Sequence, residues 1–67
     1  MAKLPMEAAR VAAGFTQEKL AEKLDVSRGY VNMIENGKVE VKPTYLYAFC
    51  HVTGFSEDDI LLPKRST

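Results

Sequence analysis

Apolar residues recur along this chain at the spacing of an α-helix, and proline, glycine and hydroxyl residues mark where each helix begins and ends. Because residues three and four positions apart share one helix face, the spacing predicts five short helices. Their expected extents are about 5–13, 16–24, 28–35, 43–53 and a last short helix between Ser56 and Pro63. No alternating stretch is long enough to predict a strand, and residues 38–42 are expected to form a loop. The pattern therefore predicts a compact all-α domain.

The helix boundaries follow from residues with specific backbone properties. Pro5 suits the first position of the first helix, where its missing N–H has no partner to lose. Gly14 and Gly54 can adopt the left-handed conformation that ends a helix. Three hydroxyl residues are expected to cap the second, third and last helices: Thr16, Ser27 and Ser56. The spacing of Ser56 and Asp59 is typical of a capping box, with aspartate in place of the usual glutamate.

The inward-facing residues of each predicted helix form a thin apolar core. The list is Met6, Ala9, Arg10 and Ala13, then Leu20, Ala21 and Leu24, then Val31 and Ile34, then Leu46, Phe49 and Cys50, and finally Phe55, Ile60 and Leu61.

Composition limits the possible classes of protein. The chain has 67 residues, of which 46% are hydrophobic and 27% charged, which indicates one small globular domain and excludes a multi-domain enzyme. Nine basic residues balance nine acidic ones. Cys50 has no possible disulfide partner, and the sequence has no signal peptide or apolar run long enough to span a membrane. We therefore expect a cytoplasmic domain, with 1–67 as one unit and a flexible tail over 63–67.

The stretch from Thr16 to Gly37 carries the functional signal. It predicts two short helices joined by the three-residue turn 25–27, with the small Ala21 where the helices approach and the apolar Val26 inside the turn. This arrangement fits a helix-turn-helix over about 16–36, in which the second helix lies in the major groove of DNA.

At these residues the chain resembles the Cro/lambda-repressor-like, or XRE, family of helix-turn-helix transcriptional regulators. The resemblance runs without gaps from about Leu4 to Leu62. It rests on the motifs Gly14-Phe15-Thr16-Gln17-Glu18-x-Leu20-Ala21, Val26-Ser27, Ile34-Glu35-Asn36-Gly37-Lys38 and Gly54-Phe55-Ser56. It implies a five-helix lambda-repressor-like fold and binding to double-stranded operator DNA. The size is similar to that of phage Cro-like proteins and of small controllers of mobile elements.

The outward face of the third helix is expected to read bases. Arg28 can donate two hydrogen bonds to guanine, Asn32 can pair with adenine, and Met33 can touch a thymine methyl. Gly29 is unfavourable within a helix, and a close approach of the backbone to DNA is one reason to tolerate it. Three of these residues have a simpler alternative: Arg28 as a solvated first-turn residue, Met33 packed along the surface, and Gly29 as drift.

Residues that border this helix are expected to contact the DNA backbone. They are Gln17, Ser27, Tyr30, Asn36 and Lys38, and Gln17 has this role by similarity to the family. The alternative for Tyr30 is packing over the second helix or exposure to solvent, and for Ser27 it is a capping role alone. Family resemblance also implies a partly buried structural salt bridge between Arg10 and Glu35.

Two features count against strong DNA binding. Asp25 stands where the family usually has a turn glycine; it tolerates left-handed geometry but adds a negative charge. Residues 16–42 include five basic and five acidic residues, so non-specific affinity is expected to be weak. A homodimer would supply the missing affinity, with Tyr45, Tyr47 and Leu62 as candidate interface residues.

Enzyme and metal sites find little support in the sequence. Cys50 and His51 are adjacent and so do not face each other on a helix, and no set of three or four metal ligands is evident. No cofactor or small-molecule ligand is expected. The sequence thus favours a dimeric repressor that occludes a palindromic operator. The alternatives are an antitoxin-like or other protein-interaction module on the same fold, and the N-terminal piece of a longer repressor.

Overall fold

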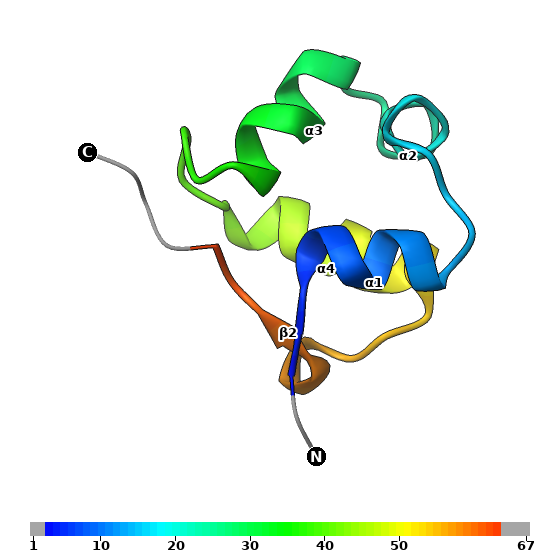
Figure 1. Cartoon of the computed structure of the whole chain (residues 1–67), viewed down its shortest axis with the longest axis vertical. Helices are drawn as coiled ribbons and strands as arrows, with labels where there is room; N and C mark the ends of the chain where they lie inside the picture. The colour runs from blue at the N-terminus through cyan, green and yellow to red at the C-terminus, as the bar shows by residue number, and fades with distance from the viewer. Residues whose placement is uncertain (1–2, 64–67) are drawn as a thin grey trace.

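The computed structural model describes residues 3–63, and the α-helices in this range follow the predicted order (Figure 1). They are α1 (Met6–Ala12), α2 (Gln17–Leu24), α3 (Arg28–Glu35) and α4 (Pro43–Thr53). The predicted limits of α2, α3 and α4 are confirmed. Residues 38–42 form a loop, also as predicted. Apart from Pro63, the predicted flexible tail lies outside the described residues.

Two of the predicted hydroxyl caps explain the sharp starts of α2 and α3. Thr16 Oγ1 accepts a hydrogen bond from the N–H of Lys19 at 3.1 Å, and Ser27 Oγ accepts one from the N–H of Tyr30 at 3.0 Å. Each cap gives a partner to an N–H that the first helical turn leaves free. The caps therefore fix where the two helices of the helix-turn-helix begin.

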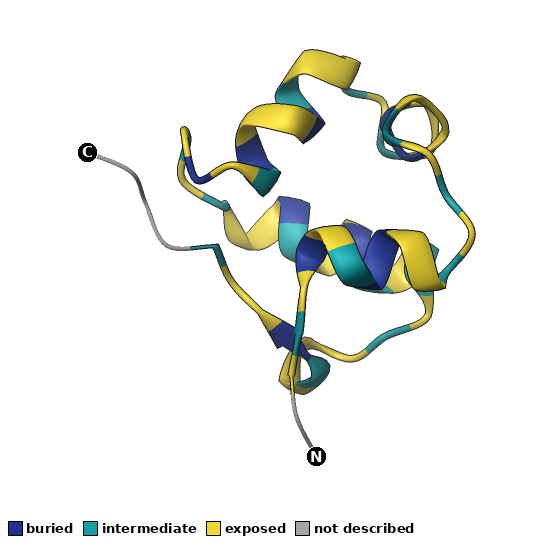
Figure 2. Ribbon diagram, viewed as in Figure 1, coloured by how far each residue is buried: buried dark blue, intermediate teal, exposed yellow. Residues whose placement is uncertain are grey.

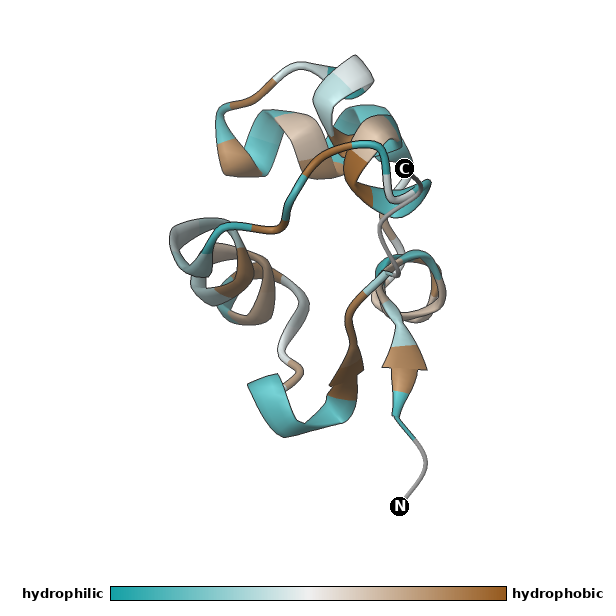
Figure 3. Ribbon diagram, turned by 90° about the vertical axis from the view of Figure 1, so that its left-hand side faces the viewer, coloured by the Kyte–Doolittle hydropathy of each residue, from teal (hydrophilic) through white to brown (hydrophobic). Residues whose placement is uncertain are grey.

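The predicted fifth helix is wrong. A single 3-10 turn, η1 (Glu57–Asp59), is followed by an extended pair, β2 (Ile60–Leu61), which runs parallel to β1 (Leu4–Pro5). Figure 3 shows the two short strands side by side. The segment is too short to nucleate a helix on its own, and Leu4 offers Ile60 a strand partner instead. The predicted pairing of Ser56 with Asp59 is confirmed, since the Ser56 N–H donates to Asp59 Oδ2 at 3.1 Å.

The same pairing shifts the start of α1. Leu4 precedes a proline, which disfavours a helical backbone, and it lies opposite Ile60 in the sheet. Pro5 is extended as well, with ψ 154°, so the helix begins at Met6 rather than at Pro5.

The core lies where α1, α2, α3, α4 and β2 meet, and the buried positions in Figure 2 face this centre. Its buried apolar members are Met6, Ala9, Leu20, Ala21, Val31, Ile34, Tyr45, Phe49 and Ile60. Most of the predicted core is confirmed. Leu61 is a correction: it is 52% exposed, because neighbouring residues of a strand point to opposite sides and Ile60 takes the inward position.

Candidate nucleic-acid interface

α3 is held against the body of the domain along one side. Val31 and Ile34 are fully buried, three residues apart on the inner face. α2 packs against α3, and the buried residues of α2 are Leu20 and Ala21. The small side chain of Ala21 is compatible with a close approach of the two helices. The inner face of α3, the second helix of the helix-turn-helix, is therefore packed against the domain, and its opposite face is exposed to solvent.

The turn between α2 and α3 adopts the geometry expected of it. Asp25 has the left-handed backbone conformation, with φ 58° and ψ 45°, and ends α2. The N–H of Val26 then donates to the carbonyl of Ala21 at 3.0 Å, while the Val26 side chain packs against the core. Aspartate thus fills a position that glycine would occupy with less strain.

The predicted base-reading residues lie together on the exposed side of α3. Arg28, Gly29 and Asn32 are exposed, and Met33 is 42% exposed. Within residues 3–63, Arg28 makes no hydrogen bond or ion pair, so its guanidinium has all its donors available. A Cβ added to Gly29 would meet only Ser27 Oγ, at 3.9 Å, which means that the fold itself leaves room for a larger residue there.

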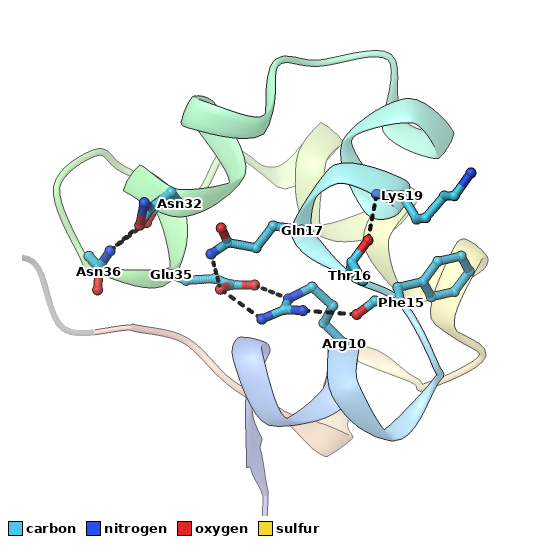
Figure 4. Close-up of polar contacts among 8 residues, drawn as sticks. All are labelled: Arg10, Phe15, Thr16, Gln17, Lys19, Asn32, Glu35 and Asn36. Atoms are coloured by element: carbon cyan, nitrogen blue, oxygen red, sulfur yellow. Dashed lines mark hydrogen bonds and ion pairs between the residues drawn. The ribbon is translucent and has the colours of Figure 1, made fainter.

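Asn32 and Asn36 interact along the edge of α3, as Figure 4 shows. The Nδ2 group of Asn36 donates to the backbone carbonyl of Asn32 at 3.0 Å and also to Asn32 Oδ1. Both residues remain exposed to solvent. The contact uses both side-chain donors of Asn36, so a phosphate contact through this amide requires the pair to open.

A buried polar cluster joins α1, α2 and α3 (Figure 4). Arg10 Nε donates to Glu35 Oε2 at 2.7 Å, and Arg10 Nη1 donates to the carbonyl of Phe15 at 2.8 Å. The side chains of Arg10 and Glu35 are only 10% and 4% exposed. The structure thus contains the ion pair that the family resemblance implied. The pair fixes the C-terminal end of α3 to α1 and to the segment before α2.

Gln17 belongs to this cluster, which the sequence did not reveal. Its Nε2 donates to Glu35 Oε1 at 2.9 Å. One amide hydrogen is therefore used inside the protein, and the other remains for a phosphate. No periodic spacing could have indicated this contact, because the two residues lie in different helices.

The other residues expected beside the DNA backbone differ in exposure. Ser27 and Lys38 are exposed at either end of α3. Tyr30 is half-buried, and its ring packs edge-on against that of Tyr45, with the ring centres 5.7 Å apart. The Tyr30 ring therefore packs against α4 through Tyr45.

The three candidate residues of the dimer interface also differ in exposure. Tyr45 is 8% exposed and stacks on Phe49 in the core, which corrects the expectation that it faces a partner. Tyr47 and Leu62 are 58% and 48% exposed. Residues two positions apart point to different sides of a helix, and so Tyr45 turns inward where Tyr47 turns outward.

Tyr45 and Cys50 have raised pKa values. Burial, with a further effect of the carboxylate of Glu35, raises the pKa of Tyr45 to about 12. Burial, followed by the negative charges of Glu57 and Asp59, raises the pKa of the Cys50 thiol. A raised pKa keeps the thiol protonated, which is the opposite of what a cysteine nucleophile requires.

The described part of the chain contains no group of three or more histidine, cysteine, aspartate or glutamate side chains placed to hold a metal ion. None of its helices is both long and apolar enough to cross a membrane.

A family model described as HTH_3, helix-turn-helix, matches residues 6–60, which is most of the chain. No curated protein and no solved structure matches.

Proposed function

Because the chain belongs to the HTH_3 helix-turn-helix family of Cro/C1-type, or XRE, proteins, we propose that it is a dimeric transcriptional repressor that reads a palindromic operator. The family match implies DNA binding and transcriptional regulation, and the family is not one of enzymes. The finer statements, on the residues that read DNA, on repression and on the dimer, are our proposal. A regulator of this kind works where the DNA is, so we place it in the cytoplasm.

One observation carries the assignment of the reading surface. α3 buries Val31 and Ile34 completely, while Arg28 and Asn32 project from its other side. A helix held in this way can enter the major groove, where arginine and asparagine side chains can distinguish base pairs by their hydrogen-bond pattern. Gly29 lies between them and lets the helix backbone approach the bases closely.

Residues at the edges of this surface contact the DNA backbone. Ser27, Lys38 and the free amide hydrogen of Gln17 are the groups that we assign to phosphates. The charge balance of the chain and the exposed Asp25 keep the electrostatic attraction small. Affinity for unrelated DNA is therefore low and depends only weakly on salt.

A second copy compensates for this weak attraction. Two α3 helices about 34 Å apart would occupy successive turns of one DNA face, which requires a palindromic site. Tyr47, Leu61 and Leu62 are the exposed apolar residues that we assign to the contact between copies. The bound dimer represses by covering DNA that polymerase or a competing regulator needs. Sedimentation with and without operator tests the dimer, and a monomer in both conditions would refute it.

Selection of bound duplexes from a random pool tests the reading surface. The wild type should enrich one palindromic motif. Arg28→Ala and Asn32→Ala should each lose about 1–3 kcal/mol of binding free energy and relax the preference at one base pair per half-site. Lys3→Ala is a matched control, since it also removes an exposed positive charge but lies just before β1, outside the helix-turn-helix. If both α3 variants select the wild-type motif with unchanged affinity, the assignment is wrong.

The second candidate function is a protein-interaction module, such as an antitoxin-like subunit that masks a partner. The zero net charge and the exposed Val11 and Leu61, both outside the helix-turn-helix, favour it. Retention on immobilised DNA separates the two functions. Retention that falls as salt rises supports the regulator, whereas no retention at low salt supports the interaction module.

A further inference from the structure

The hydrogen bonds between Asn32 and Asn36 fix which way each amide faces. The backbone carbonyl of Asn32 can only accept a hydrogen bond, so the Asn36 atom at 3.0 Å from it must be the nitrogen Nδ2. This nitrogen carries a second hydrogen, which points at the side-chain amide of Asn32. The Asn32 atom that receives it must be an acceptor, which is Oδ1.

The orientation of Asn32 has a chemical consequence. One of the two lone pairs of its Oδ1 accepts from Asn36, and its Nδ2 is left free on the exposed side of α3. In this state Asn32 offers DNA both hydrogens of its Nδ2, whereas its Oδ1 is turned toward Asn36 and has one lone pair left. An asparagine that pairs with adenine in both directions needs Oδ1 to accept from adenine N6 while Nδ2 donates to N7. The paired Asn32 is therefore poorly suited to adenine.

We propose that Asn36 is a specificity-determining residue that holds Asn32 as a donor, so that Asn32 reads guanine rather than adenine. Guanine presents two neighbouring acceptors, O6 and N7, in the major groove, and an amide with only donors matches them. Asn36 does this without touching a base. The inference rests on the proposed DNA-binding function, and it revises our own expectation that Asn32 pairs with adenine.

Affinity for two duplexes tests the proposal. Asn32→Ala first identifies the base pair whose preference depends on Asn32. The affinities for duplexes with guanine and with adenine at that position are then compared. The wild type should prefer guanine. Asn36→Ala removes the contact and should lower the guanine-to-adenine affinity ratio on the order of 3- to 10-fold, the value of one exposed hydrogen bond.

Asn36→Asp is a sharper variant. Aspartate accepts hydrogen bonds and cannot donate, so it should turn the Asn32 amide around and expose Oδ1. The ratio should fall at least as far as in Asn36→Ala. The added negative charge weakens binding to both duplexes alike and cancels in the ratio. Glu40→Gln, an exposed change in the following loop, should leave the ratio as it is.

The outcomes separate the inference from the proposed function. A wild type that prefers adenine, or an unchanged ratio in Asn36→Ala, overturns the inference while DNA binding stands. A wild type that selects no motif overturns the proposed function. Side-chain amide exchange measured by NMR in the free protein checks the contact without DNA. The NH₂ hydrogens of Asn36 should exchange more slowly than those of Asn32, and the reverse order would also overturn the inference.

Discussion

Arg10 donates a hydrogen bond from Nε to Oε2 of Glu35 over 2.7 Å, and both side chains are nearly excluded from solvent. Glu35 is the last residue of α3, and Arg10 lies in α1. The pair therefore sets the position of one end of the proposed reading helix relative to the body of the domain. Gln17 and the carbonyl of Phe15 complete the hydrogen bonds of the two charged groups.

Breaking this pair should strongly destabilise the domain. Arg10→Met leaves the Glu35 carboxylate buried without its cation, and we expect a loss of about 3–5 kcal/mol in the free energy of unfolding, measured with urea. The double variant Arg10→Met/Glu35→Leu should recover much of the loss, because no buried charge remains. A single variant that loses under about 1 kcal/mol would mean that the pair behaves as a surface ion pair.

Gly29→Ala should separate stability from binding. The added methyl group has no atom closer than Ser27 Oγ at 3.9 Å, so alanine should stabilise α3 by about 1 kcal/mol. Operator affinity should fall in the same variant, because the methyl group would stand between the helix backbone and the bases. Thermal unfolding and operator titration measure the two effects. Equal or tighter operator binding would show that Gly29 has no role at the DNA.

Asp25 combines a backbone role with an unfavourable charge, and two variants distinguish them. Asp25→Asn removes the charge and keeps a residue that tolerates the left-handed conformation, so stability should change by less than about 0.5 kcal/mol. Operator affinity should rise and fall off more steeply with salt. Asp25→Gly should bind similarly and be about 0.5 kcal/mol more stable. Operator titrations over a range of salt concentrations measure these affinities. If Asp25→Asn bound the operator no tighter than the wild type, the unfavourable role of the Asp25 charge would be contradicted.

Tyr45 should make the domain less stable in alkali. Its pKa is about 12 in the folded protein, against about 10 in an unfolded chain, so the folded state holds the phenol proton more tightly. This contribution is fully present below about pH 10 and is lost as the pH rises from about 10 to about 12. Unfolding free energies measured across this window should decline less steeply in Tyr45→Phe. Identical slopes in both proteins would argue against a buried phenol.

Local signals predicted α2, α3 and α4 well, because Thr16 and Ser27 cap the first two, Pro43 begins the third, and each has an apolar face within its own sequence. The segment after Gly54 was predicted wrongly for the opposite reason. What decides its structure is Leu4, at the other end of the chain, whose backbone pairs with Ile60. Such a partner leaves no trace in the periodicity of either segment.

The candidate site shows the same division. The exposed positions of Arg28, Gly29, Asn32 and Met33 follow from the inward turn of Val31 and Ile34, which the sequence predicts. The hydrogen-bond partners of the site residues were harder to predict from the sequence. Asn36 is one helical turn from Asn32, so that contact was within reach of spacing alone, whereas the contact of Gln17 with Glu35 needed the packing of α2 against α3. Tyr45 and Tyr47 were grouped together by composition and separated by helix geometry.

The parallel pairing of Leu4 with Ile60 also determines when the domain can form during synthesis. A nascent chain lacks the second strand, and the buried Ile60 side chain, until almost all of the described residues have left the ribosome. The helices of the amino-terminal half can form earlier, but the sheet that joins the two ends cannot close. Folding of this domain is therefore completed only after Ile60 has left the ribosome.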